Sequence, residues 1–282
     1  MSAPEGLLLI DKPPGITSHD VVDEVRRALG VRKVGHAGTL DPMATGLMLV
    51  CVGRATRLLR YVTGLDKVYE GNALLGVETD TLDAEGTVVA RSEVDVDEQR
   101  LLAAMSKLVG EIRQIPPAHS AVKVQGRKLY EAARKGESID APARTVRIDS
   151  YELTASDLPM FDFRVRCSSG TYIRSLIADT GAELGCGAHL SALRRLRVGG
   201  FEVAEATGPS DPGSPYPLER VVAHLPHRPL DAAEADAVSH GRRLEPAGIE
   251  GPYAVEREGV LLAVYRDEGD AARAEMVLPE VG

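Results

Sequence analysis

Short apolar runs and amphipathic stretches follow one another along this chain in no regular order, and this mixture limits the folds open to it. Apolar runs of strand length stand at residues 6–11, 47–53 and 68–76, and further strands are expected at 145–154, 161–167 and 196–203. Apolar residues at helical spacing indicate helices at 17–30, near 55–63, at 97–110 and after the turn at 168–170. The mixed order predicts an α+β fold, and periodicity alone leaves its topology open.

A stretch rich in Pro, Gly and Ser divides the chain into a large and a small part. The sequence GPSDPGSPYP lies within a linker predicted at about 205–218. We therefore expect a main domain at 1–228 and a C-terminal domain at 229–282. The second part is too small to be stable easily by itself, so it should pack against the first.

The charge of the chain is unevenly distributed. The formal net charge is −9, but residues 78–98 and 231–282 each carry a net −7. Residues 121–147 hold seven bases, among them Lys123, Arg127, Lys128 and Arg134, against three acids. Read alone, this basic stretch is either a solvated face or a surface for RNA, because local charge rather than overall charge sets the electrostatic footprint.

Several classes of protein are excluded by missing motifs. There is no phosphate loop, HExxH, GxSxG or dinucleotide GxGxxG, so an enzyme of this sequence is expected to need no cofactor. No run approaches the roughly 18 apolar residues of a membrane span, and the N-terminus does not resemble a signal peptide. The three cysteines form no CxxC, which fits a reduced cytoplasm. Cys186 and His189 are too few ligands for a metal site, so none is predicted.

The segment GHAGTLDPMATG at 35–46 is the densest unusual stretch. Its small residues permit close approach of the backbone to a ligand. Asp41 precedes a proline, which biases it toward an extended conformation. Two interpretations remain open from the residues alone. Asp41 either caps a helix that begins at Pro42 or belongs to a functional site that contains His36.

This segment resembles the active-site motif of the bacterial tRNA pseudouridine synthase B (TruB) family. Further similar segments follow in the family's order, at 11–22, 66–86, 115–136, 167–181 and 187–199. One local departure is His119, where the family usually has Tyr. The resemblance implies an isomerase with a pseudouridine synthase catalytic domain, built on a central, largely antiparallel mixed sheet, and a small C-terminal PUA-like domain.

The resemblance also implies roles for the residues that match the motifs. Asp41 is expected to be the catalytic carboxylate, and Arg174 to pair with it and keep it ionised. Tyr69 would lie against the target uracil and is a candidate to move its C5 proton. His36 would fill the space that a flipped base leaves. Each role has an alternative. Arg174 would otherwise be a solvated helix arginine, Tyr69 a half-buried strand tyrosine, and His36 an ordinary loop histidine.

Three more positions are expected near the site. Tyr172 and Leu193 would line the pocket, although ordinary core packing explains them almost as well. Lys12 would support the site from the end of the first strand, unless it is a surface lysine. A loop at about 116–144, with Lys123, Arg127, Lys128 and Arg134, would bind RNA phosphates.

The substrate implied by the resemblance is uridine 55 in the T-loop of tRNA. Pseudouridine formation breaks the N1–C1′ bond and rejoins the uracil through C5, with no redox step and therefore no cofactor. The uridine must be flipped out of its stack to react. Two alternatives remain: an inactive RNA-binding or tRNA-folding protein on the same fold, and a paralogue acting on another RNA. A cytoplasmic enzyme with no obligatory protein partner is predicted.

Overall fold

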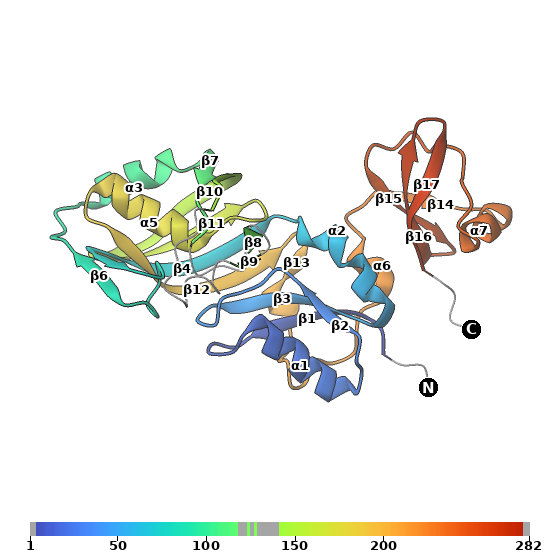
Figure 1. Cartoon of the computed structure of the whole chain (residues 1–282), viewed down its shortest axis with the longest axis horizontal. Coiled ribbons are helices and arrows are strands. Elements are labelled where there is room, and N and C mark those ends of the chain that lie inside the picture. The colour runs from blue at the N-terminus through green and yellow to red at the C-terminus, as the bar shows by residue number, and fades with distance from the viewer. Residues whose placement is uncertain (1–3, 118–122, 125–126, 129–140, 279–282) are drawn as a thin grey trace.

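The computed structural model of the 282-residue chain describes residues 4–117, 123–124, 127–128 and 141–278. It is elongated, with a large, helix-covered sheet at one end and a small sheet at the other (Figure 1). No helix among the described residues is long and apolar enough to cross a bilayer.

The large sheet is built from strands far apart in sequence. The described strands are β1 (Gly6–Lys12), β2 (Val34–Ala37), β3 (Thr45–Val52), β4 (Lys67–Leu75), β7 (Gly110–Gln114), β10 (Arg144–Asp157), β11 (Met160–Cys167), β12 (Ala188–Val198) and β13 (Phe201–Glu202). Their order is β1-β3-β12-β4-β11-β10-β7, with β2 beside β3 and β13 beside β12. Only the β12–β3 pairing is parallel among these strands. The predicted α+β fold with a largely antiparallel mixed sheet is confirmed.

The helices begin and end at residues that explain their limits. The described helices are α1 (Ser18–Leu29), η1 (Gly53–Leu58), α2 (Leu59–Thr63), α3 (Glu98–Lys107), α5 (Ile173–Leu184), η2 (Val203–Glu205), α6 (Leu218–Val221) and α7 (Ala232–Ser239). Before α1, the Thr17 hydroxyl accepts from the backbone of Asp20, whose carboxylate accepts from the backbone of Thr17. This capping box satisfies helix donors that lack partners, and Gly30 ends the helix in the left-handed conformation.

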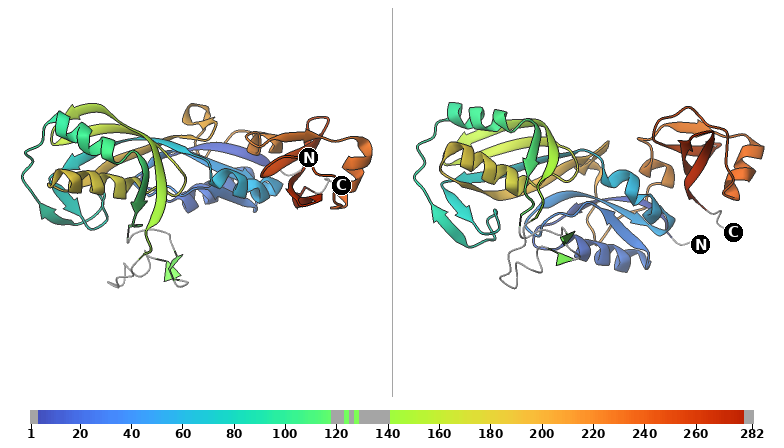
Figure 2. Two further views of the ribbon diagram at one scale, coloured as in Figure 1. Left: turned by 90° about the horizontal axis from the view of Figure 1, so that it is seen from above. Right: turned by 45° about the horizontal axis from the view of Figure 1, so that its top comes forward.

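The apolar strand β1 is covered on both faces. Leu8 and Ile10 belong to a core cluster under α1, α3 and α5, whereas Leu7 and Leu9 belong to a second cluster. Side chains of a strand alternate between faces, so burial of both faces accounts for the uninterrupted apolar run. Figure 2 shows α3 and α5 side by side over the part of the sheet that carries β10 and β11.

The C-terminal sheet packs on the main part of the chain, as expected. It consists of β14 (His227–Pro229), β15 (Pro252–Arg257), β16 (Val260–Glu268) and β17 (Ala271–Val277). Its Val264 and Met276 belong to the same buried cluster as Leu7 and Leu9. The hydroxyl of Tyr61 on α2 also donates to the carboxylate of Glu275 at 3.0 Å. The contact surface is therefore apolar at its centre, with a polar link from α2.

Two short hairpins complete the described elements: β5 (Val77–Thr79) pairs with β6 (Val88–Arg91), and β8 (Lys123–Val124) with β9 (Arg127–Lys128).

One predicted strand is wrong. Residues 196–203 are not a single strand, because β12 ends at Val198 and η2 begins at Val203. The arginines of 194–197 obscured the true strand, since Arg195 is buried against the sheet despite its charge. The Pro- and Gly-rich stretch at 205–218 is held along β1, where Leu7 and Tyr216 exchange backbone hydrogen bonds at 2.9 and 2.7 Å.

Candidate active site

Asp41 lies in a turn between β2 and β3. Its carbonyl oxygen accepts from the backbone of Ala44 at 3.1 Å, and strand β3 begins directly afterwards. The interpretation of Asp41 as a helix cap is therefore wrong, because no helix follows it. The turn packs closely on β12: a side chain at Gly46, whose φ is +102°, would meet the Arg195 carbonyl oxygen at 2.3 Å. Only glycine fits there, which explains its place in the motif.

Arg174 stands between two carboxylates. It is the second residue of α5 and is 5% exposed, so it is not a solvated helix arginine. Its Nε lies 3.0 Å from Asp41 Oδ2, and its Nη1 lies 3.3 Å from Asp83 Oδ2. The same Nη1 donates to the carbonyl of Thr81 at 2.9 Å. One buried guanidinium thus fixes both carboxylates by charge-assisted contacts.

The pKa of Asp41 is raised above its ordinary value. Burial is the main cause, and the negative charge of Asp83 adds to it. Arg174 opposes the rise, as the sequence suggested, but its effect is smaller than that of burial. Asp41 is therefore easier to protonate than an exposed aspartate, even with a cation in contact.

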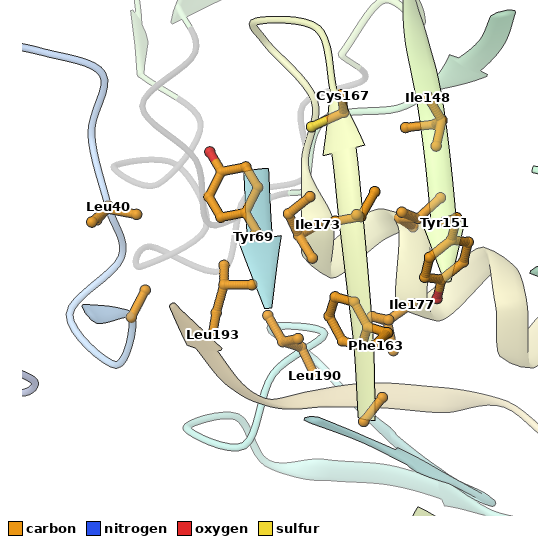
Figure 3. Close-up of a cluster of buried hydrophobic side chains, with 14 of the residues drawn as sticks. Leu40, Tyr69, Ile148, Tyr151, Phe163, Cys167, Ile173, Ile177, Leu190 and Leu193 are labelled. Atoms are coloured by element: carbon orange, nitrogen blue, oxygen red, sulfur yellow. The ribbon is translucent and has the colours of Figure 1, made fainter. Parts of the chain in front are cut away.

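A pocket of about 290 Å³ opens beside Asp41. That volume is at the small end of the range for small-molecule sites. Its wall contains Tyr69 and Leu193, both buried, and Leu40 and Ile173 stand near them (Figure 3). The Tyr69 ring supplies an apolar face, and burial raises the pKa of its hydroxyl.

Tyr172 also lines the pocket, at the N-cap position of α5. Its backbone N–H donates to Gln114 Oε1 at 3.0 Å, and its carbonyl accepts from Gln114 Nε2 at 3.2 Å. The guanidinium of Arg144 lies over its ring, 5.5 Å from the centroid. These contacts fix the backbone of Tyr172 and leave its half-buried ring at the mouth of the pocket.

Lys12 and His36 lie close to the site without lining the pocket. Lys12 is fully buried, so the surface interpretation is wrong, and its Nζ donates to Pro13, Pro42 and Ala44 carbonyls at 3.0, 3.0 and 2.7 Å. It supports the Asp41 turn from behind. His36 is half-buried on β2, and its Nδ1 has no partner among the described residues. Burial lowers the pKa of His36, which favours the neutral ring.

Three charged residues near the site are not predicted from the sequence: Asp83, Lys67 and Arg195. Asp83 belongs to the acidic stretch 78–98, yet it is 4% exposed and its carboxylate contacts Arg174. Lys67 and Arg195 both line the pocket. The alternation of side chains along a strand could have predicted two of them. Lys67 stands two residues before Tyr69, and Arg195 two residues after Leu193, so each shares a strand face with a predicted pocket residue.

The predicted RNA-binding loop is described only in part. The backbones of Lys123, Arg127 and Lys128 lie in β8 and β9, whereas their side chains and all of Arg134 fall outside the described residues.

Comparison with protein families identifies the chain. The model for the N-terminal domain of the TruB family pseudouridylate synthases matches residues 26–173, more than half of the sequence. The chain belongs to the TruB family. Two further models match later segments: the tRNA pseudouridylate synthase B C-terminal domain at 174–208, and the tRNA pseudouridine synthase II C-terminal domain at 225–279. Members of the TruB family are pseudouridine synthases, so this chain is an enzyme that makes pseudouridine.

Curated TruB relatives cover almost the whole chain. The tRNA pseudouridine synthase B of Thermobifida fusca (strain YX) is 46% identical over 97% of this chain and 98% of its own length. That of Mycobacterium tuberculosis (strain ATCC 25618 / H37Rv) is 45% identical over 97% and 95%. Among solved structures, a Cbf5-Nop10-Gar1 complex matches with a TM-score of 0.75 at 28% identity, covering 97% of this chain and 85% of the other. An H/ACA RNP bound to a substrate RNA containing 2′-deoxyuridine gives a TM-score of 0.73 at 26% identity, with the same coverage.

Proposed function

We propose that this protein converts uridine 55 in the T-loop of tRNA to pseudouridine, with Asp41 as the catalytic carboxylate. The observation that carries the proposal is the placement of Asp41 in the wall of a small pocket, held by Arg174 at 3.0 Å and facing the same space as Tyr69. The names of the curated relatives, tRNA pseudouridine synthase B, support tRNA as the substrate.

The chemistry requires a carboxylate, a wall for the uracil and protection from solvent. Asp41 acts as nucleophile or as base in breaking the N1–C1′ bond, and either role needs its ionised form. The contact with Arg174 fixes the direction of the carboxylate before substrate arrives. Once detached, the uracil must turn so that C5 faces C1′, and the Tyr69 ring and Leu193 would keep it in place while it does so.

A uridine stacked in an RNA loop cannot reach this pocket, so we propose that the enzyme flips it out. Flipping costs a few kcal/mol. We propose that His36 fills the vacated position, and its lowered pKa supports a neutral ring in that role. Its buried Nδ1, which lacks a partner among the described residues, would gain one from the RNA.

The wider RNA contacts follow from the same proposal. Tyr172, at the mouth, would contact the target nucleotide, and Lys12 would maintain the Asp41 turn. Phosphate contacts would come from the loop at 116–144. Residues 1–228 would form the catalytic domain, and 229–282 a PUA-like domain that adds tRNA affinity. Because the substrate is tRNA, we place the enzyme in the cytoplasm.

The test uses an unmodified tRNA transcript and the purified protein. Pseudouridine should form at position 55 of the wild-type transcript. A transcript with cytidine at position 55 should gain none anywhere, which controls for nonspecific modification. Pseudouridine at another position would support the paralogue hypothesis. Tight binding without any pseudouridine would favour the inactive RNA-binding alternative.

A further inference from the structure

Two cations in the wall of the pocket have no carboxylate within ion-pair distance among the described residues. Lys67 and Arg195 line the pocket and are 6% and 1% exposed. Among the described residues, ion-pair contacts within this pocket join only Arg174 to Asp41 and Asp83. Buried charges normally carry a counterion, because desolvation disfavours an unpaired charge.

Both cations are tied to backbone carbonyls, Arg195 also hydrogen-bonds the Tyr69 side chain, and both still have donors to spare. Lys67 Nζ donates to Thr63 at 3.0 Å and to Leu65 at 2.6 Å. Arg195 donates from Nε to Leu47 at 2.7 Å and from Nη2 to Gly38 at 3.0 Å. An ammonium has three N–H groups and a guanidinium five. These contacts therefore orient the two side chains without using all of their donors or neutralising their charge.

The two side chains converge on the backbone of Gly38, three residues before Asp41. A Cβ at Gly38 would lie 3.4 Å from Arg195 Nη1 and 3.8 Å from Lys67 Cε. The positive charges are thus close enough to oppose one another. Burial and the neighbouring Arg195 lower the pKa of Lys67 to about 8, which is the response expected of a buried cation beside a second cation.

We propose that Lys67 and Arg195 bind a phosphate that flanks the target uridine. This inference rests on the proposed function, since the ligand that enters the pocket is then a nucleotide. Tyr69 and Leu193 form an apolar wall suited to the base, and the phosphodiester is the anionic part of a nucleotide. A non-bridging oxygen on the spare donors of Lys67 and Arg195 would neutralise the cations and anchor the nucleotide while its base is detached.

The first test changes the RNA and leaves the pocket intact. T-arm hairpins carry a neutral methylphosphonate at the linkage on the 5′ or the 3′ side of the target uridine. Their affinity is measured with the Asp41→Asn protein, which keeps the RNA unconverted. At one of the two linkages, affinity should fall about tenfold or more, the effect of losing a hydrogen-bonded charge. Unchanged affinity at both linkages overturns the proposal.

The second test asks whether Lys67 is a group that binds the phosphate. In the Asp41→Asn background, Lys67→Met should weaken binding of the unmodified hairpin and remove most of the methylphosphonate effect. A matched control, Lys107→Met, changes an exposed lysine of α3 and should retain the full methylphosphonate effect. If Lys67→Met also retains it, Lys67 has a structural role only and the proposal is wrong.

The two proposals fail in different ways. Wild-type protein that makes no pseudouridine at position 55 contradicts the proposed function, whatever the hairpins show. Normal pseudouridine formation together with equal binding of all hairpins contradicts the phosphate site alone. If thermal unfolding shows that Lys67→Met does not fold, the methylphosphonate hairpins still test the phosphate site, because they are measured with Lys67 and Arg195 unchanged.

Discussion

Two groups of charged residues at the pocket use buried charge in opposite ways. In the paired group, Arg174 is held between Asp41 and Asp83, so each charge has a partner before any substrate binds. In the unpaired group, Lys67 and Arg195 contact backbone carbonyls and the Tyr69 side chain, and neither has an ion-pair partner among the described residues. In the proposed reaction, the first arrangement fixes the carboxylate in advance, whereas the second leaves charge available for a ligand. The comparison separates residues expected to govern the rate from residues expected to govern nucleotide binding.

The largest effect should come from removing the negative charge of Asp41, in the paired group. Asp41→Asn keeps the shape of the side chain, and we expect pseudouridine formation to fall by more than about a thousandfold, toward the upper range for a positioned catalytic group. Binding of tRNA should persist, because its phosphate contacts lie elsewhere. Single-turnover assays and filter binding measure the two quantities. Asp211→Asn, at an exposed position, is the control. Substantial turnover by folded Asp41→Asn protein would refute the mechanism.

The second prediction sets Arg174→Met against Lys67→Met in protein stability. The first change leaves two carboxylates near an apolar pocket without their cation and should lower the free energy of unfolding by about 3–5 kcal/mol. The second removes a cation that has no ion-pair partner among the described residues, and loses its carbonyl contacts, so the change should stay within about 1 kcal/mol. Urea unfolding measures both. Equal losses in the free energy of unfolding would mean that the paired and unpaired groups do not differ in the way described.

The pH dependence of the rate tests the raised pKa of Asp41. The reaction needs the carboxylate, so the single-turnover rate should fall as pH drops through a pKa above the ordinary aspartate value. Asp83 contributes to that rise. Asp83→Asn should therefore move the acid limb to lower pH, whatever it does to the maximal rate. A limb that stays in place, or moves to higher pH, would show that Asp83 does not control the ionisation of Asp41.

The smallest effects are expected from single substitutions in the predicted RNA-binding loop. Lys123→Gln, Arg127→Gln, Lys128→Gln and Arg134→Gln should each reduce the slope of log affinity against log salt by at most about 0.7, the value for one phosphate contact on a single strand. None should change the response to a methylphosphonate beside the target uridine, in contrast to Lys67→Met. Titrations at several salt concentrations provide the measurement. An unchanged slope in all four variants would support the solvated-face interpretation.

The sequence was informative where chemistry lies in a local motif and uninformative where strands meet over long distances. Asp41 and Arg174 were paired correctly because both lie in segments similar to TruB motifs. Asp83 was missed because it stands among many other acids in the stretch 78–98, and nothing local distinguishes it from them. Arg195 was missed because its partner Tyr69 lies on β4, and their pairing depends on sheet order. Burial of Arg195 also disguised the limits of β12, since a charged strand residue usually indicates the solvent side.

Strand β12 also determines when the enzyme can become active as it folds. It is the strand that joins β3, which follows the Asp41 turn, to β4, which carries Tyr69. Synthesis finishes both of these strands long before Ala188 is added. Until then β4 lacks its partner along Lys67–Leu75, β3 lacks its partner at Thr45 and Gly46, and the pocket lacks the wall that Leu193 and Arg195 form. Pairings between segments so distant in sequence form slowly. Unpaired edges in the meantime invite other strands to add to them. A growing chain that stops short of β12 would hold Asp41 and Tyr69 without the complete pocket between them.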